Sequence, residues 1–290
     1  MQRIIYVPPG GSFEDAQKRV VLGAEEPFIL ASVSGLGGSE ADIISSETVG
    51  MDGEAYHGTH IPPRFVKCTV SIKGQNRADL YAERMRLAGL LRPQGNKKGD
   101  LYYENDHVSV KIKAVPKVPG DFEKRIKLYL SSEIEFYCPD PYWSGLSEHR
   151  ADIANVEGAG LVLPCEFNSI VLMRTINELD INNSGTSRAP VRITIIGPSE
   201  SPVITNQTAG KAIRLRRALS SGEILVINTE RGNKSVRLYS NDTETDAFGY
   251  LHPLSKFWEL EPGVNHIVYG NGGQAETSVH INWFDRYAGV

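Results

Sequence analysis

The chain has 290 residues, of which 40% are hydrophobic and 23% are charged, and its formal net charge is −4. This length allows sizeable hydrophobic cores and predicts two domains rather than one. The acidic balance disfavours a general nucleic-acid binder, because such proteins usually carry a basic excess.

Cysteine usage and the N-terminus narrow the class further. Cys68, Cys138 and Cys165 are odd in number and show no CxxC spacing, which disfavours a disulfide framework or a zinc knuckle. Residues 1–9 do not form a secretory signal, since a proline pair ends a short apolar run. No apolar stretch approaches the ~20 residues that a membrane span needs. We therefore expect a protein of the cytoplasm of the producing cell.

The first half of the sequence predicts strands around one helix. Alternation of apolar and polar residues predicts strands at 27–33, 65–72, 101–103, 108–113 and 125–137. For the helix, Asn76 is a suitable N-cap, Asp79 favours the first turn and Pro93 ends it. A single helix among strands predicts an α+β domain.

A run near the midpoint of the chain, residues 136–143, interrupts this pattern. Pro139 and Pro141 flank Asp140, so neither a helix nor a central strand can continue through the run. Aromatic residues including Trp143 crowd around the break, and a flexible linker would not need them. We interpret Pro139, Asp140, Pro141 and Trp143 as a stiff structural joint between two domains.

The second half shows almost no helical pattern. Short strands separated by turn residues are predicted at 191–196, 212–216, 223–228, 235–239, 256–260, 265–269 and 277–283. This spacing is typical of an all-β sandwich. Residues 144–160 are expected to be a poorly structured lead-in. The predicted domains are 1–143 and 144–290, and the fold class is mainly β with minor α.

Two segments suggest ligand chemistry but have simpler structural interpretations. The glycine-rich segment 34–38 could cradle a phosphate, but Glu40 occupies the position of a third glycine and would repel a pyrophosphate. A glycine turn is favoured. His57 and His60 have an HxxH spacing, yet a helical HExxH motif is absent and the preceding segment 51–54 is more simply a hairpin turn. We expect no metal site and no cofactor.

Catalytic residues are not indicated either. Cys138 or Cys165 with His149 could form a thiol nucleophile and its base, but neither cysteine has a family signature around it. Apolar surroundings would raise the pKa of Cys138 rather than lower it. Carboxylates are plentiful, as a glycosidase requires, but nothing singles out a pair. The sequence therefore predicts no catalytic residue.

Two further features could contact a partner. The densest basic cluster contains Lys211, Arg214, Arg216 and Arg217, and a solvated strand edge is favoured over phosphate contact. Trp258 follows another aromatic residue, and one of two adjacent aromatics faces outward on a strand. Trp258 is thus a possible interface or sugar contact.

The order of several segments resembles a known family. In the first half these are 26–30 with 34–37, Asp52-Gly53 with 63–74, the helix ending at 91–93 with 101–103, and the proline-containing run 138–143. In the second half they are 222–229, 255–269 and 281–290. Their shared order and spacing resemble the distal tail proteins of siphophages, the siphovirus-type tail component, over nearly the whole chain.

The resemblance implies a structural function in a virion tail tip, assembled in the host cytoplasm. The N-terminal domains of six copies would form a ring, and the second domain would be a galectin-like antiparallel β-sandwich. The implied partners are the tail tube protein, the tail-associated hub protein and, in some phages, a receptor-binding protein. DNA would pass the central channel without specific binding. A galectin-type sugar motif is absent from 150–290, which implies a scaffold rather than a lectin.

Two alternatives remain at this stage. A carbohydrate-binding adhesin for host wall attachment would rest on the sandwich and on Trp258. A wall-degrading hydrolase would require turnover of peptidoglycan, which we do not expect.

Overall fold

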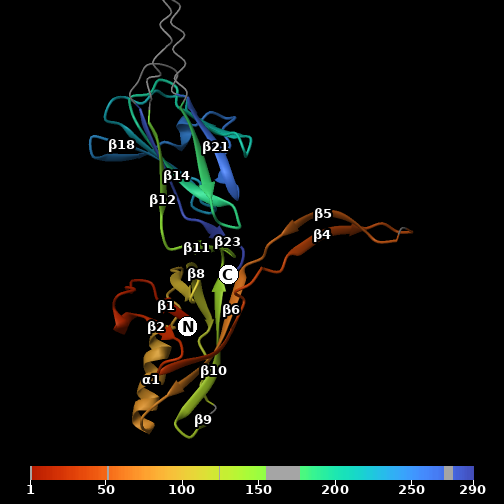
Figure 1. Cartoon of the computed structure of the whole chain (residues 1–290), viewed down its shortest axis with the longest axis vertical. Coiled ribbons are helices and arrows are strands. Elements are labelled where there is room, and N and C mark those ends of the chain that lie inside the picture. The colour runs from red at the N-terminus through yellow and green to blue at the C-terminus, as the bar shows by residue number, and fades with distance from the viewer. Residues whose placement is uncertain (1, 51, 124, 155–176, 271–276) are drawn as a thin grey trace, which may run out of the picture. The chain divides into compact units, whose positions relative to one another are not determined.

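The computed structural model describes residues 2–50, 52–123, 125–154, 177–270 and 277–290 (Figure 1). It divides the chain into two compact units, unit 1 with residues 1–146 and 287–290 and unit 2 with residues 147–286. The division was expected after residue 143, and the last four residues were expected in the second domain. Among the described residues, no helix is long and apolar enough to cross a membrane.

Unit 1 is built on an antiparallel sheet in the order β2-β1-β7-β8-β10-β6-β3, with β9 and β11 attached to β10 and β8. The strands are β1 (Arg3–Val7), β2 (Val20–Leu22), β3 (Phe28–Ser34), β6 (Arg64–Lys73), β7 (Gly99–Glu104), β8 (Ser109–Val118), β9 (Arg125–Ile126), β10 (Tyr129–Cys138) and β11 (Trp143–Gly145). Strand β23 (Arg286–Tyr287) spans the boundary between the units, and a short 3-10 helix, η1, covers Ala16–Lys18.

One core holds unit 1 together. Strand β8 pairs with β7 through its first residues and with β10 through its last, so two parts of the sheet share this strand. Alternate residues of β6, from Val66 to Ile72, are fully buried and pack with residues of both parts. The alternation that predicted strand 65–72 therefore arises because one face of the strand packs on the core and the other faces away from it.

The helix α1 (Arg77–Leu90) is confirmed, with the predicted N-cap. The Asn76 side chain accepts a hydrogen bond from the Asp79 backbone N–H, and the Asp79 carboxylate accepts one from the Gln75 N–H. The first hydrogen bond satisfies one of the donors that a helix start leaves open, and the second ties the residue before the N-cap to the first turn. Leu80 and Leu87 are buried in the core of unit 1, which fixes the helix against the sheet.

A separate two-stranded hairpin in unit 1 consists of β4 (Asp42–Glu47) and β5 (Glu54–His60). The predicted turn 51–54 falls at the connection of this hairpin, with Glu54 as the first residue of β5 and residue 51 outside the described residues. In Figure 1 it stands away from the sheet of unit 1, and among the described residues its strands pair only with each other. We call it the arm.

Unit 2 has two antiparallel sheets around one core, which confirms the predicted sandwich. The first sheet has the order β12-β22-β14-β17-β18-β19, with β20 beside β14, and the second has the order β13-β21-β15-β16. The strands are β12 (His149–Ala154), β13 (Asn177–Asn183), β14 (Ala189–Ile196), β15 (Val203–Asn206), β16 (Lys211–Arg214), β17 (Ile224–Asn228), β18 (Ser235–Ser240), β19 (Thr243–Asp246), β20 (Glu259–Leu260), β21 (Gly263–Gly270) and β22 (Ser278–Trp283), with a 3-10 helix, η2, at Phe248–Tyr250.

Two expectations for the second half are corrected. The lead-in 144–160 was expected to be poorly structured, but β12 (His149–Ala154) pairs with β22 over its whole length. Residues beyond 154 in that segment lie outside the described residues. The strand predicted at 256–260 is limited to β20, because the preceding segment crosses beside β16 instead: the Lys256 N–H donates to the Ala212 carbonyl at 2.8 Å.

Candidate interaction surfaces

The proline-containing joint belongs to unit 1 and is held there by one buried arginine. Arg64 is 4% exposed. Its Nε donates to the Pro141 carbonyl at 2.6 Å, and its Nη1 donates to the carbonyls of Gly35 and Gly37, each at 2.6 Å. Its Nη2 donates to the carbonyl of Ala288. One side chain thus connects the joint, the glycine turn and the C-terminal residues.

All four acceptors of the Arg64 guanidinium are backbone carbonyls, and burial lowers its pKa. A buried cation is costly unless its donors are satisfied, so these carbonyls are the main compensation for burying it. Trp143 is fully buried in the core of unit 1. Of the joint residues, Pro139 is exposed and Asp140 and Pro141 are partly exposed. Their role as a stiff joint remains a prediction.

The glycine turn at 34–38 has a structural reason for its composition. Gly35 adopts a φ of +85°, which favours glycine, and a Cβ at this position would lie 2.0 Å from the Phe65 carbonyl oxygen. The turn presents its carbonyls to Arg64, and the Val290 N–H donates to the carbonyl of Leu36 at 3.0 Å. Because the carbonyls of this turn accept hydrogen bonds from a buried cation, the turn contributes to packing and does not form a phosphate cradle.

The arm exposes several large apolar side chains. Ile43, Ile44 and Tyr56 are 69%, 54% and 66% exposed, and Val49 near the turn is fully exposed. Residues 40–60 contain five carboxylates and no lysine or arginine. Isolated two-stranded hairpins are marginally stable, and exposed apolar surfaces of this kind mark contact sites. The arm therefore has the features of an element that binds another protein surface.

A surface cavity of about 550 Å³ lies elsewhere on unit 1, between β1, β2 and the start of β3. Ile5, Phe13 and Phe28 give it apolar walls, while Arg19 and Arg86 contribute guanidinium groups that lie over the rings of Phe13 and Phe28. The Nε atoms of both arginines are buried without an acceptor among the described residues. The lining also includes Glu25 and Glu26, so this cavity combines apolar walls with charged groups of both signs.

The candidate metal and catalytic residues are not brought together. The ring of His57 is hydrogen-bonded to Ser46 on the arm, and the described part of the chain contains no cluster of three metal-ligating side chains. Cys68 and Cys138 are buried, and burial raises the pKa of each thiol to about 12. Such thiols are protonated and unreactive at neutral pH. Cys165 lies outside the described residues.

His149, the other member of the proposed thiol pair, has a different partner. Its Nε2 lies 3.1 Å from a carboxylate oxygen of Asp285, and its ring stacks on Trp283 in unit 2. Cys138 belongs to unit 1. Nothing among the described residues couples the histidine to a thiol.

The basic cluster is distributed over different environments. Strand β16 is the last strand of its sheet, but the segment 252–256 covers its outer edge through hydrogen bonds to the carbonyls of Ala212 and Arg214. Arg217 pairs with Glu223 at 2.6 Å, and Arg216 donates to a backbone carbonyl. The segment 252–256, rather than the basic side chains, therefore covers the outer edge of β16.

Trp258 is the buried member of its aromatic pair. It is 1% exposed and belongs to the core of unit 2, while Phe257 is partly exposed, stacks on Phe248 and lies 5.4 Å from the Lys234 Nζ. A sugar platform needs an accessible ring face, which Trp258 does not provide. Its indole N–H has no acceptor among the described residues.

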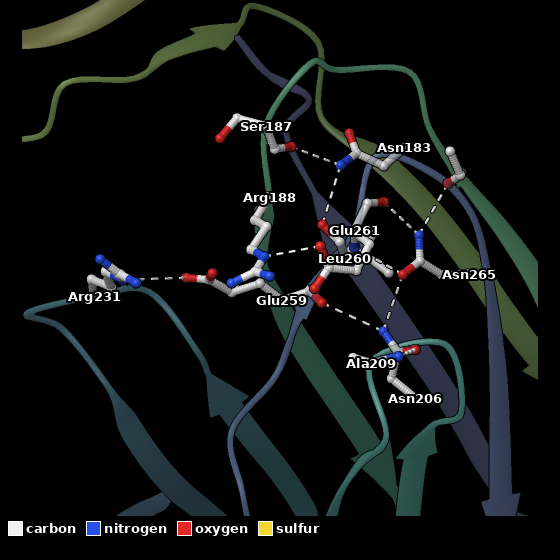
Figure 2. A network of polar contacts seen from close by, with 11 residues as sticks. Asn183, Ser187, Arg188, Asn206, Ala209, Arg231, Glu259, Leu260, Glu261 and Asn265 are labelled. Carbon is white, nitrogen blue, oxygen red and sulfur yellow. Dashed lines mark hydrogen bonds and ion pairs between the residues drawn. The ribbon is translucent and has the colours of Figure 1, made fainter. Parts of the chain in front are cut away.

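A network of buried asparagines fixes the chain on the C-terminal side of Trp258 (Figure 2). Asn206 and Asn183 donate to the carbonyls of Glu259 and Leu260 at 3.4 and 3.2 Å. Asn265 donates to the Glu261 carbonyl at 2.7 Å and accepts from the Glu261 N–H at 2.9 Å. Three successive residues of the backbone are thereby held by side-chain amides. The sequence predicts a strand at 265–269, within β21, but gives no signal for β13, for β15 or for the asparagine network.

Comparisons with known proteins agree with this architecture. The phage tail protein RIFT-related domain matches residues 17–138, and the siphovirus-type tail component, C-terminal domain, matches residues 184–287. Comparison with curated proteins gives no match. The first matched range lies within unit 1, and the second lies within unit 2 except for residue 287, which belongs to unit 1.

Solved structures show the same fold over the whole chain. The crystal structure of the Dit protein of phage SPP1, described as a paradigm of the hub adsorption apparatus of phages that infect Gram-positive bacteria, is similar with a TM-score of 0.66 and 14% identity, covering 99% of each chain. A chain in the activated baseplate of phage P2 with calcium is similar with a TM-score of 0.51 and 12% identity, covering 96% of this chain and 97% of that one.

The two matched domains together cover well over half of the sequence. The class of protein is therefore a phage tail component. More specifically, the chain belongs to the siphovirus-type tail component family, the distal tail proteins of siphophages.

Proposed function

We propose that the chain is a structural, non-enzymatic subunit of the tail tip, of which six copies form a ring that joins the tail tube to the tail-associated hub or baseplate. The ring would let DNA pass through its centre. The similarity to tail-hub and baseplate proteins supports the location in the virion tail. Assembly would take place in the host cytoplasm before the virion is complete.

The observation that carries this proposal is the arm. Its strands have no partner among the described residues beyond each other, and it exposes Ile43, Ile44 and Tyr56. A ring subunit needs an element that reaches a neighbouring copy, and a hairpin with open edges and apolar side chains supplies both backbone and side-chain contacts. Burial of these side chains on a neighbour would offset the cost of exposing them in the monomer.

The charge of the arm is consistent with a conduit for DNA. Residues 40–60 carry five carboxylates without a compensating lysine or arginine, and like charge disfavours retention of a polyanion. Channel-facing loops are proposed to be acidic or neutral. Strong retention of DNA by the purified ring at moderate salt would contradict this part of the proposal.

The proposal is tested by changing the apolar surface of the arm while leaving the body of unit 1 intact. In the variant Ile43→Ser/Ile44→Ser/Tyr56→Ser, we expect ring formation, alone or with the tube protein, to be lost in electron micrographs. Far-UV circular dichroism should remain unchanged, because none of these side chains contributes to the core.

A matched control replaces exposed apolar residues away from the arm. Met85→Ser/Ile126→Ser removes side chains of unit 1 that are 75% and 65% exposed. We expect this control to assemble as the unmodified chain does. Normal rings from the arm variant would show that the arm does not form the contact between copies, and the absence of rings from the unmodified chain with its tube partner would contradict the proposed function itself.

A further inference from the structure

A small cationic pocket lies on unit 2 beside Trp258. Its volume is about 120 Å³, and it is lined by residues from the loop before β14, the start of β16, the turn between β17 and β18, and the segment around β20. The charged residues of its lining are Arg188, Lys211, Arg231, Lys234, Glu259 and Glu261. The four cations outnumber the two carboxylates, although the net charge of the chain is −4.

The two carboxylates of this pocket are already engaged. Arg188 Nε lies 2.9 Å from a carboxylate oxygen of Glu261, and Arg231 Nε lies 3.9 Å from one of Glu259 (Figure 2). Lys211 and Lys234 have no carboxylate partner among the described residues, and the Lys234 ammonium lies over the Phe257 ring. Two positive charges therefore remain uncompensated around one small concavity.

The pocket is also preorganised. The asparagine network holds the backbone at 259–261 through three carbonyls. The carboxylates of Glu261 and Glu259, which pair with Arg188 and Arg231, therefore extend from a fixed backbone. Trp258 lines the pocket, and its buried indole N–H has no acceptor among the described residues. A fixed arrangement of donors reduces the entropy lost when an anion binds.

We infer that this pocket binds a phosphate-type oxyanion, either inorganic phosphate or the phosphoryl group of a phosphodiester polymer. The volume admits a small anionic group rather than a sugar ring with its neighbours, and a tetrahedral oxyanion offers several acceptors to converging guanidinium and ammonium donors. This inference does not rest on the ring proposal, because it concerns residues of unit 2 alone.

The direct test is a titration of the full chain with inorganic phosphate, followed by the indole N–H resonances in ¹H–¹⁵N spectra. Trp258 is assigned by comparison with the variants Trp143→Phe and Trp283→Phe. We expect a saturable shift of the Trp258 resonance with a Kd of about 1 mM or tighter. Added sodium chloride should weaken binding, because the uncompensated charges are near the surface.

The variant Lys211→Gln/Lys234→Gln removes the two uncompensated charges. We expect its affinity for phosphate to fall at least about tenfold, since charge-assisted hydrogen bonds are roughly twice as strong as neutral ones. The matched control Arg214→Gln/Lys256→Gln removes two exposed charges from β16 and the adjoining segment outside the pocket lining. It should retain the affinity of the unmodified chain, and melting curves verify that both variants are folded.

Poly(glycerol phosphate) distinguishes the two sources of the anion. Binding to the polymer at least about tenfold tighter per phosphate than to inorganic phosphate would assign the site to a phosphodiester polymer, while equal affinity would assign it to the free anion. The inference is overturned if the unmodified chain shows no saturable shift of Trp258, or if the pocket variant and the control bind phosphate equally.

Discussion

Replacement of Arg64 by methionine tests how unit 1 holds its joint, its glycine turn and its C-terminal residues. The substitution keeps a long side chain but removes the donors to the carbonyls of Pro141, Gly35, Gly37 and Ala288. A carbonyl that stays shielded from water costs about 1–3 kcal/mol when it loses its donor. Because water can reach part of the space and burial of the guanidinium carries its own cost, we expect a net loss of about 3–5 kcal/mol.

For a unit of this size, such a loss lowers the melting temperature by about 6–20 °C. Calorimetry measures the melting temperature, and hydrogen exchange read by mass spectrometry locates the change. We expect faster exchange in residues 34–38 and 287–290 and in β6, with the strands of unit 2 unaffected, since every acceptor belongs to unit 1.

Arg125→Met is the matched control, because Arg125 lies in the same unit and is exposed. Its melting temperature should stay near that of the unmodified chain, as is usual for surface substitutions. The reasoning is refuted if Arg64→Met lowers stability by less than about 1 kcal/mol, or if exchange increases equally in both units.

Three further outcomes follow from single sites. Gly35→Ala should destabilise unit 1 by more than about 2 kcal/mol in urea unfolding because of its positive φ and the Phe65 carbonyl oxygen, whereas Gly37→Ala should be near neutral because no atom lies within 4 Å of an added Cβ. Asp180 raises the pKa of His266, so this pair stabilises unit 2 below the unfolded pKa of about 6.5 and loses that effect as pH rises through the folded value. An NMR titration should therefore give a pKa for His266 that falls in Asp180→Asn. The two buried thiols of unit 1, with pKa values of about 12, should resist iodoacetamide in a Cys165→Ser variant until it is unfolded.

Apolar alternation and turn chemistry were sufficient to predict much of the fold. Strand β6, the N-cap at Asn76 and the strands of the sandwich core each show a local pattern that the structure confirms. Strands β12 and β13 were missed because their residues are largely polar. Asn183 in β13 is buried and donates to the carbonyl of Leu260, 77 positions away, and such pairing leaves no periodic signal.

The contact surfaces were less accessible to sequence reasoning. Arg64 resembles any charged residue at the start of a strand, and its role depends on carbonyls up to 224 positions away. Within the arm only the turn and the spacing of His57 and His60 stand out in the sequence, because exposed and buried isoleucines look alike there. Trp258 was singled out as a possible contact residue, but its ring is buried. Tertiary packing decides which of these side chains a partner can reach.

The mass of the particle in solution tests the central claim most directly. Light scattering coupled to size-exclusion chromatography should be recorded for the chain alone and after mixing with its tail tube protein. The ring proposal predicts six copies of the 31.9 kDa chain per particle, either alone or in the mixture. A monomer at every concentration, with and without the tube protein, would contradict it.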